Sequence, residues 1–192
     1  MDADRIKWNQ RFSTDGALLS GEPSPFLMRE IERIKRLAPG KRALDIACGV
    51  GRNSIFLAQQ GFRVTALDIS DVGIARGREW ADARGVVVDF QRVDLDGYRI
   101  VEKYDLIVNF NFLLRELIPE EVNALVPGGL LLFDTILEAP HLLESHKRDY
   151  LLRHGELVQL FRAHPGEILF DEEVYKGDFP TARLMFRKRE QE

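Results

Sequence analysis

Apolar and polar residues follow two different periods along the chain. Between residues 26 and 37, apolar side chains fall at helical spacing with Arg and Glu between them, which predicts an amphipathic helix. Ser24 is a suitable N-cap and Pro25 a suitable first helical residue. The helix is expected to end at Pro39-Gly40, because proline and glycine stop helices.

From Lys41 onward, short apolar runs alternate with helical segments. This alternation predicts βαβ units and a parallel sheet. Several of the runs are almost wholly apolar, as in strands that helices cover on both faces. The expected strands are 43–47, 63–69, 86–93, 105–109 and 130–136, and the expected helices are 53–60, 71–84, 117–126 and 147–162.

Two further extended segments, 167–176 and 181–187, flank a turn at residues 177–180 and predict a hairpin that closes the sheet. The residues therefore predict an α/β fold, a doubly wound, mostly parallel seven-stranded Rossmann-like sheet with a C-terminal antiparallel hairpin strand. We expect a single domain over 1–192, with a helical or lid-like segment at 1–40 before a core at 41–192. Glycine and proline make 13–25 an irregular surface loop.

Composition narrows the classes of partner. The 192 residues suit one domain, and 45% are apolar and 30% charged. The formal net charge is -4, and without a basic excess we expect no nucleic-acid partner. The N-terminus is acidic, and no apolar run is long enough to span a membrane. One cysteine, Cys48, cannot form an internal disulfide, so we expect a cytoplasmic protein without a membrane partner. The oligomeric state stays open.

The strongest chemical signal is a glycine loop between a strand and a helix, at Asp45-Ile46-Ala47-Cys48-Gly49-Val50-Gly51. Glycine permits positive φ and lets a ligand approach the backbone closely. The helix that follows presents unpaired N–H groups toward that ligand. Ligands bind at this edge of a doubly wound sheet.

Acids follow the next two strands. Asp68 lies nineteen residues after Gly49, where a carboxylate can accept hydrogen bonds from both ribose hydroxyls of an adenosine. Asp94 ends the third strand, where an acid could accept from the adenine amino group. The alternative is that these acids only cap helices or decorate loops, but three acids at carboxyl strand ends, Asp68, Asp94 and Asp96, favour an adenosine site.

Two features distinguish the adenosine cofactors. A dinucleotide fingerprint has a third glycine where this chain has Ser54, and it places a pyrophosphate where Asp45 would repel it. S-adenosylmethionine has no phosphate and carries an ammonium and a sulfonium, which an acid beside the loop suits. We therefore expect S-adenosylmethionine. The alternatives are an NAD(P)-binding oxidoreductase and a non-catalytic S-adenosylmethionine-binding module.

The run from Leu44 to Ser54 also resembles the first motif of class I methyltransferases, and its Gly-Arg-Asn-Ser end is similar to the tellurite-resistance (TehB-like) type. The resemblance continues through residues 61–68, 93–95 and 125–129. It implies an S-adenosylmethionine-dependent methyltransferase whose product is S-adenosylhomocysteine, with Cys48 as a packing residue. The candidate cofactor-binding residues are Asp45, Ala47, Gly49, Gly51, Arg52, Asn53, Asp68, Ile69, Asp94, Leu95, Asn109 and Phe110.

Residues 8–12 and 22–27 resemble the lid-like N-terminal segment of many such enzymes. The resemblance implies a cover over the cofactor, with Arg11 near a carboxylate. The alternative interpretation is an amphipathic strap on the core.

The methyl acceptor is expected to be small. The chain lacks the Asp/Asn-Pro-Pro-aromatic motif of amino-adenine methylases, a Pro-Cys dipeptide, and an insertion large enough for a recognition domain. The tellurite-type resemblance suggests a chalcogen oxyanion or another small soft nucleophile. Arg153 could hold an anion or pair with Glu156. No metal motif or catalytic residue is identified, and the acceptor-side candidates are Arg11, Phe112, Arg115, His141, Arg153 and His154.

Overall fold

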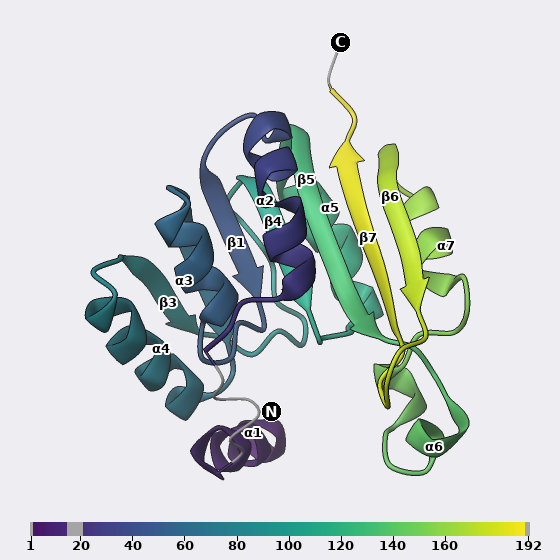
Figure 1. Cartoon of the computed structure of the whole chain (residues 1–192), viewed down its shortest axis with the longest axis horizontal. Helices are drawn as coiled ribbons and strands as arrows, with labels where there is room; N and C mark the ends of the chain where they lie inside the picture. Colours follow the sequence, from purple (N-terminus) through teal and green to yellow (C-terminus); the bar gives the residue numbers. More distant parts are fainter. Residues whose placement is uncertain (1, 15–20, 191–192) are drawn as a thin grey trace.

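The computed structural model describes residues 2–14 and 21–190. Its strands are β1 (Arg42–Ile46), β2 (Arg63–Asp68), β3 (Val88–Arg92), β4 (Tyr104–Phe110), β5 (Leu125–Ile136), β6 (Gly166–Val174) and β7 (Thr181–Lys188). They form one sheet in the order β3-β2-β1-β4-β5-β7-β6 (Figure 1). Pairing is parallel from β3 to β5, and β7 is antiparallel to β5 and β6. The expected doubly wound sheet with its C-terminal hairpin is confirmed.

Helices cover both faces of the sheet. The helices are α1 (Asp2–Thr14), α2 (Pro25–Leu37), α3 (Arg52–Gln59), α4 (Asp71–Ala83), α5 (Ile118–Ala124), α6 (Pro140–Leu143) and α7 (Glu156–Arg162), with 3-10 turns η2 (Arg115–Leu117) and η3 (Arg148–Tyr150). Helices α2, α3 and α4 pack on one face, and α5 and α7 on the other (Figure 1). None of these helices is long and apolar enough to cross a membrane in the part of the chain described.

The apolar pattern explains how these layers form. Helix α2 buries Phe26, Leu27, Ile31 and Ile34 against the sheet, as its spacing predicts. Alternate residues of the strands supply the apolar clusters on the two faces of the sheet. Leu44 belongs to the core beneath α5 and α7, whereas its neighbours along β1 face α2 and α3.

The segment after β5 differs from the expected single helix over 147–162. The chain forms α6, η3 and α7 there, and Leu152 forms a parallel bridge to Leu137 beyond the end of β5. This pairing requires extended backbone, so it interrupts the helical pattern. The N-terminal segment is also helical as far as Thr14, where the sequence predicted an irregular loop from residue 13.

The first residues of β5 and β3 also differ from those that the sequence predicted. Strand β5 begins at Leu125, which was expected to be helical, because it pairs with Tyr104 before the register shifts at Leu106. Strand β3 is two residues shorter at its start than predicted, and between Arg92 and Tyr104 the chain has no helix or strand.

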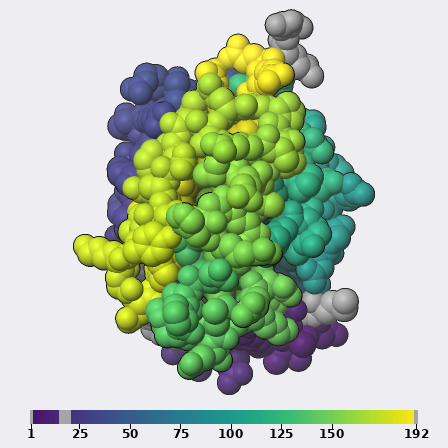
Figure 2. All heavy atoms as spheres, turned by 90° about the vertical axis from the view of Figure 1, so that its right-hand side faces the viewer, coloured from purple at the N-terminus to yellow at the C-terminus, as the bar shows by residue number. Residues whose placement is uncertain are grey.

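The carboxyl ends of the parallel strands point toward one edge of the molecule, and α1 and α6 lie along that edge (Figure 1). Figure 2 shows the neighbouring side, where α7 and β6 form one surface above α6. The order of the sheet reverses between β1 and β4, so this edge contains the switch point at which such folds bind ligands.

Candidate functional site

The glycine loop leaves β1 at the switch point and enters α3. Ala47, Gly49 and Gly51 have φ of 53°, 57° and 73°, so the loop follows a left-handed path. The backbone N–H of Cys48 donates to the Leu67 carbonyl over 2.9 Å. The loop is therefore fixed to the end of β2.

Asp68 completes this connection. Its side chain is 5% exposed, and its Oδ2 accepts the backbone N–H of Gly49 over 2.7 Å while Oδ1 accepts that of Ser70 over 2.8 Å. Burial raises the pKa of Asp68, and the N–H donors oppose that rise. An ionised carboxylate has about four lone-pair sites, so each oxygen retains capacity for another donor.

Asp45 is the second buried acid beside the loop. It is 2% exposed, and its Oδ2 accepts the Ser54 hydroxyl over 2.5 Å. Burial raises the pKa of Asp45 to about 7, with Arg52 opposing and Asp68 adding to the rise. Two desolvated acids next to one loop would repel a pyrophosphate and attract a cation. The residues present therefore fit S-adenosylmethionine better than a dinucleotide.

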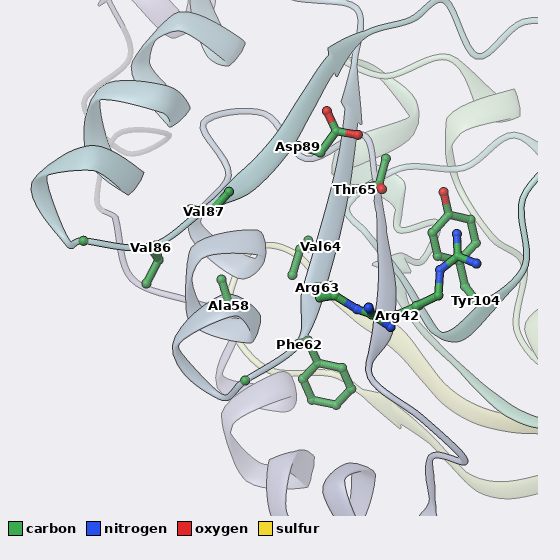
Figure 3. A pocket seen from close by; sticks show the side chains of 12 residues that line it. Arg42, Ala58, Phe62, Arg63, Val64, Thr65, Val86, Val87, Asp89 and Tyr104 are labelled. Atoms are coloured by element: carbon green, nitrogen blue, oxygen red, sulfur yellow. The ribbon is translucent and has the colours of Figure 1, made fainter.

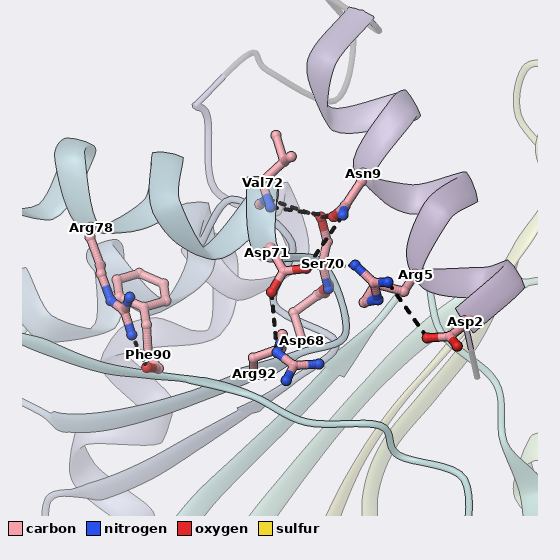
Figure 4. A network of polar contacts seen from close by, with 11 residues as sticks. Asp2, Arg5, Asn9, Asp68, Ser70, Asp71, Val72, Arg78, Phe90 and Arg92 are labelled. Atoms are coloured by element: carbon pink, nitrogen blue, oxygen red, sulfur yellow. Dashed lines mark hydrogen bonds and ion pairs between the residues drawn. The ribbon is translucent and has the colours of Figure 1, made fainter.

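Helix α1 lies over this loop and beside the start of α4, where Figure 4 shows Asn9 and Arg5 directed toward Ser70 and Asp71. A Cβ placed on Gly49 would lie 2.8 Å from Cζ of Phe12, so the ring rests directly on the glycine backbone. The Ser70 hydroxyl donates to Asn9 Oδ1 over 2.7 Å, and Asp71 pairs with both Arg5 and Arg92 at 3.1 Å. Phe12 is the only buried residue of α1. The helix therefore covers the glycine loop and the start of α4 and contributes little to the core.

Arg52 and Asn53 connect the loop to the segment before α2. Arg52 Nη1 donates to the Glu22 carbonyl over 3.2 Å. Asn53 Oδ1 accepts the backbone N–H of Ser24 over 2.8 Å in a buried position. Both candidates thus hold the chain that crosses above the first turn of α3.

The candidates after the second and third strands have different environments. Ile69 is half-buried next to Asp68. Asp94 is exposed, and its Oδ1 accepts the Asp96 N–H over 3.1 Å. Leu95 is buried in the core beneath α5. Asp94 is therefore the most accessible acid of the three strand ends.

The two candidates from β4 point into opposite layers. Phe110 packs edge-on against Phe26 of α2, with ring centroids 6.2 Å apart. Asn109 is buried on the other face, where its Nδ2 donates to Glu121 of α5 over 2.7 Å. Both side chains are part of the packing at the strand end, a role that the sequence pattern did not separate from ligand contact.

Arg115 is a structural clamp in this structure. Its Nε and Nη2 donate to the Glu156 carboxylate over 2.7 and 3.1 Å. Its Nη1 and Nη2 donate to the carbonyls of Asp149 and Leu151 over 2.7 and 2.9 Å. The guanidinium therefore holds the segment 149–156 against η2, and Glu156 is paired with Arg115, not with the Arg153 side chain.

The histidine candidates contact the C-terminal hairpin. His141 Nε2 lies 2.7 Å from the Asp178 carbonyl, and His154 Nδ1 pairs with the Glu173 carboxylate. Glu173 also accepts the Tyr175 hydroxyl over 2.6 Å and the Gly155 N–H over 2.7 Å. These side chains lie on the rim formed by α6, α7 and the hairpin.

The remaining candidates are simpler to place. Arg153 is exposed, and its backbone N–H donates to Glu156. Phe112 is half-buried against the core beneath α5. Arg11 lies over the Trp8 ring, 5.0 Å from its centroid.

Sequence reasoning missed several residues of the site. Asn9, Ser70 and Asp71 join α1 to α4, and Glu121 faces Asn109. Asn9 lies within the segment 8–12 singled out from the sequence, and Ser70 precedes the helix expected over 71–84, where a serine can serve as the N-cap. Ser70 does accept the Gly73 N–H as that cap. No pattern in the sequence marked Glu121, because its helical position alone does not reveal its partner.

A hollow lies away from the glycine loop, at the amino ends of β1 and β2 (Figure 3). It has a volume of about 750 Å³, and Arg42, Arg63 and Tyr104 are among its lining residues. This hollow is separate from the acids at the carboxyl ends of the strands, so it is not part of the candidate adenosine site.

Comparisons with known proteins agree with this geometry. The family model described as Tellurite resistance protein TehB matches residues 26–136. A protein of Geobacillus sp. (strain WCH70) is 30% identical over 164 residues, covering 81% of this chain and 62% of its own. The "Probable S-adenosyl-L-methionine-dependent methyltransferase TehB" of Haemophilus influenzae (strain 10810) is 35% identical over 96 residues, or 48% of this chain and 33% of its own. The chain thus spans only part of these relatives.

Solved structures share the fold. The crystal structure of TehB from Haemophilus influenzae superposes with a TM-score of 0.68 at 24% identity, covering 84% of this chain and 62% of that one. Magnesium protoporphyrin IX methyltransferase from Synechocystis PCC 6803 with bound SAH gives 0.74 at 18% identity, covering 97% and 99%. Because the family model spans the glycine loop, Asp68 and the strands to the end of β5, the chain belongs to the TehB tellurite resistance protein family.

Proposed function

We propose that the protein transfers a methyl group from S-adenosylmethionine to a small-molecule acceptor. The observation that carries this proposal is the pair of buried carboxylates, Asp45 and Asp68, on either side of a left-handed glycine loop at the switch point. The relatives add support, because the Haemophilus TehB is named as dependent on S-adenosylmethionine and a 30% identical protein of Nitrosococcus oceani as an O-methyltransferase.

The cofactor would supply a methyl group activated by its sulfonium. In our proposal Asp68 accepts the ribose hydroxyls, and Asp94 with Ile69 and Leu95 surrounds the adenine. Asp45 supplies negative charge near the amino-acid end, where Arg52 and Asn53 hold the first turn of α3. Ala47, Gly49 and Gly51 give the loop the left-handed path along which the ligand would lie, while the rings of Phe12 and Phe90 fill the space in front of the two glycines. Asn109 and Phe110 shape the end of β4 behind it.

Helix α1 would then exclude water above the bound cofactor. Phe12 already covers Gly49, and Asn9 anchors the helix on Ser70. Positioning two reactants in this way can supply roughly 7–11 kcal/mol of a reaction barrier. A water-poor site also favours a reaction in which an anionic nucleophile and a cationic donor lose charge. No general base is needed when the acceptor is already an anion or a soft lone pair.

The acceptor would enter from the rim that carries Phe112, His141, Arg153 and His154. A chalcogen oxyanion or another small soft nucleophile is the acceptor class we favour, since the family is the tellurite resistance type. Arg153 is exposed on this rim and could hold an anion through its planar fork. Arg11 would face the carboxylate of the cofactor from the α1 side.

Calorimetry and a turnover screen test the proposal. S-adenosylmethionine and S-adenosylhomocysteine should bind in the micromolar range and NAD should not. Release of S-adenosylhomocysteine is then measured with selenite, tellurite, thiols, phenols and amines. Binding of NAD alone would support an oxidoreductase instead. Cofactor binding with turnover only on a nucleic acid or protein would refute the small acceptor, and binding without turnover on any acceptor would favour a non-catalytic module.

A further inference from the structure

Two polar side chains face each other inside the core beneath α5. Asn109, on β4, is 1% exposed, and Glu121, on α5, is 0% exposed. Asn109 Nδ2 donates to Glu121 Oε1 over 2.7 Å. The other two atoms of this pair, Asn109 Oδ1 and Glu121 Oε2, are buried without a hydrogen-bond partner among the described residues.

A proton on the Glu121 carboxyl group would give both of these unpaired atoms a hydrogen-bond partner. An ionised carboxylate only accepts hydrogen bonds, so it would leave the amide oxygen of Asn109 and its own Oε2 unsatisfied. A neutral carboxylic acid carries one O–H donor, and Oε2–H would be directed to Asn109 Oδ1. Buried polar groups in folded proteins are nearly always paired, which favours the neutral form.

Within residues 2–14 and 21–190, no charged group is placed to neutralise an ionised Glu121. The adjoining strands present Ile107, Leu131 and Phe133 on this face of the sheet. The charged groups of the packed elements are engaged elsewhere or exposed. Arg115 binds Glu156, Glu116 is exposed, Glu120 pairs with Arg99, and Lys103 and Lys188 donate to the Asn123 carbonyl. Burial raises the pKa of Glu121 to about 7, and only the Asn109 hydrogen bond opposes it.

The pair lies next to the glycine loop. Asn109 is in register with Ile46, the residue before Ala47, on the neighbouring strand. Two residues later Asn111 takes a φ of 58° and donates its N–H to the Asp134 carbonyl over 2.7 Å. Asn109 is therefore the last residue of β4 whose side chain faces α5, and it lies beside the start of the loop.

We infer that Glu121 is a neutral carboxylic acid in the folded protein and that its proton closes a two-bond pair with the Asn109 amide. In this role Glu121 is a positioning residue, since it acts through Asn109 on the end of β4. Its effect on cofactor affinity rests on the proposed function, whereas its protonation does not.

Three variants test the inference. Glu121→Gln keeps the pair, because its amide can donate to Asn109 Oδ1 and its carbonyl can accept from Nδ2. Glu121→Ala removes the pair. Glu120→Gln, one residue earlier on the same helix, removes an acid that pairs with Arg99 at the surface and is the matched control.

Infrared difference spectra at pH 6 should show the carbonyl band of a buried neutral carboxylic acid in the wild type and in Glu120→Gln that is missing in Glu121→Gln. The difference is needed because Asp45, whose pKa is also about 7, contributes such a band in all three proteins. As the pH rises from 4.5, the ordinary pKa of a glutamic acid, to about 7, the pKa of Glu121 in the folded protein, the wild type should lose thermal stability relative to Glu121→Gln. The difference should stay constant at higher pH. An unchanged band in Glu121→Gln, or a stability difference independent of pH, would overturn the inference.

Titration with S-adenosylhomocysteine gives the functional readout. Affinity should fall in the wild type as pH rises through 7 and fall less in Glu121→Gln. Equal pH profiles would refute the positioning role. If no variant binds S-adenosylhomocysteine while the infrared band behaves as expected, the proposed function fails and the assignment of the proton stands.

Discussion

The backbone N–H of Gly49 donates a 2.7 Å hydrogen bond to Oδ2 of Asp68, so the acid at the end of β2 holds the loop that follows β1. The same carboxylate is the one expected to accept the ribose hydroxyls. In the proposed function, loop geometry and cofactor recognition would therefore depend on a single side chain. Any change at Asp68 should alter both.

Asp68→Ala should weaken S-adenosylhomocysteine binding by roughly tenfold to several hundredfold, because hydrogen bonds to a charged group contribute about 1.5–3 kcal/mol each. Calorimetry measures the affinity, and circular dichroism checks that the variant is folded. Asp96→Ala removes an exposed acid near the end of β3 and serves as the control. Wild-type affinity in Asp68→Ala would mean that Asp68 has only a structural role.

Asp45→Asn should weaken S-adenosylmethionine binding more than S-adenosylhomocysteine binding, because only the former carries the sulfonium charge. We expect a difference of roughly fivefold to thirtyfold, or about 1–2 kcal/mol, for charges separated by several ångströms in a partly buried site. The asparagine can still accept the Ser54 hydroxyl, so the loop should keep its shape.

The pH dependence of that affinity provides a second check. Burial raises the pKa of Asp45 to about 7, and a bound cation favours the ionised form. Binding of S-adenosylmethionine, measured relative to S-adenosylhomocysteine, should therefore tighten as pH rises through 7. Asp45→Asn should lose this dependence. A pH-independent ratio in the wild type would place the sulfonium away from Asp45.

Asn9→Ala should loosen α1 without unfolding the core. Asn9 Oδ1 accepts the Ser70 hydroxyl over 2.7 Å and the Val72 N–H over 3.3 Å, and α1 buries little else besides Phe12. Hydrogen exchange should accelerate in residues 2–14 while the melting temperature stays nearly constant. Thr14→Ala, which removes only a bond to the Gln10 carbonyl, is the control. Equal hydrogen-exchange rates in residues 2–14 of the two variants would contradict the anchoring role of Asn9.

Arg115→Met should destabilise the protein by about 2–3 kcal/mol, because it removes four hydrogen bonds from a partly buried guanidinium. Arg153→Met should leave the unfolding free energy nearly unchanged, since the Arg153 side chain is exposed. Urea denaturation compares the two. If Arg153→Met also leaves turnover of a small anion unchanged, the arginine takes no part in acceptor binding. Equal stability in both variants would show that the Arg115 clamp is not needed.

The sequence by itself determined the order of the elements and the position of the loop. Parallel strands present their carboxyl ends at one edge, so acids that end consecutive strands, Asp45 and Asp68, must come close together. The antiparallel hairpin at residues 166–188 followed from its turn residues in the same way. These features are local or follow from the topology, which is why the pattern of residues predicts them.

Only the tertiary structure decided which partner each polar side chain has. Arg115 meets Glu156 across 41 positions of sequence, and Asn109 meets Glu121 across 12. The pairing of Leu152 with Leu137 also broke a helix that periodicity alone predicted over 147–162. A hydrophobic period specifies which face of an element is buried, but the residues that this face contacts come from segments distant in the sequence. For that reason the contacts of Arg115 with Glu156 and of Phe110 with Phe26 could be read only from the structure, and the expected ligand contacts of both residues stay predictions.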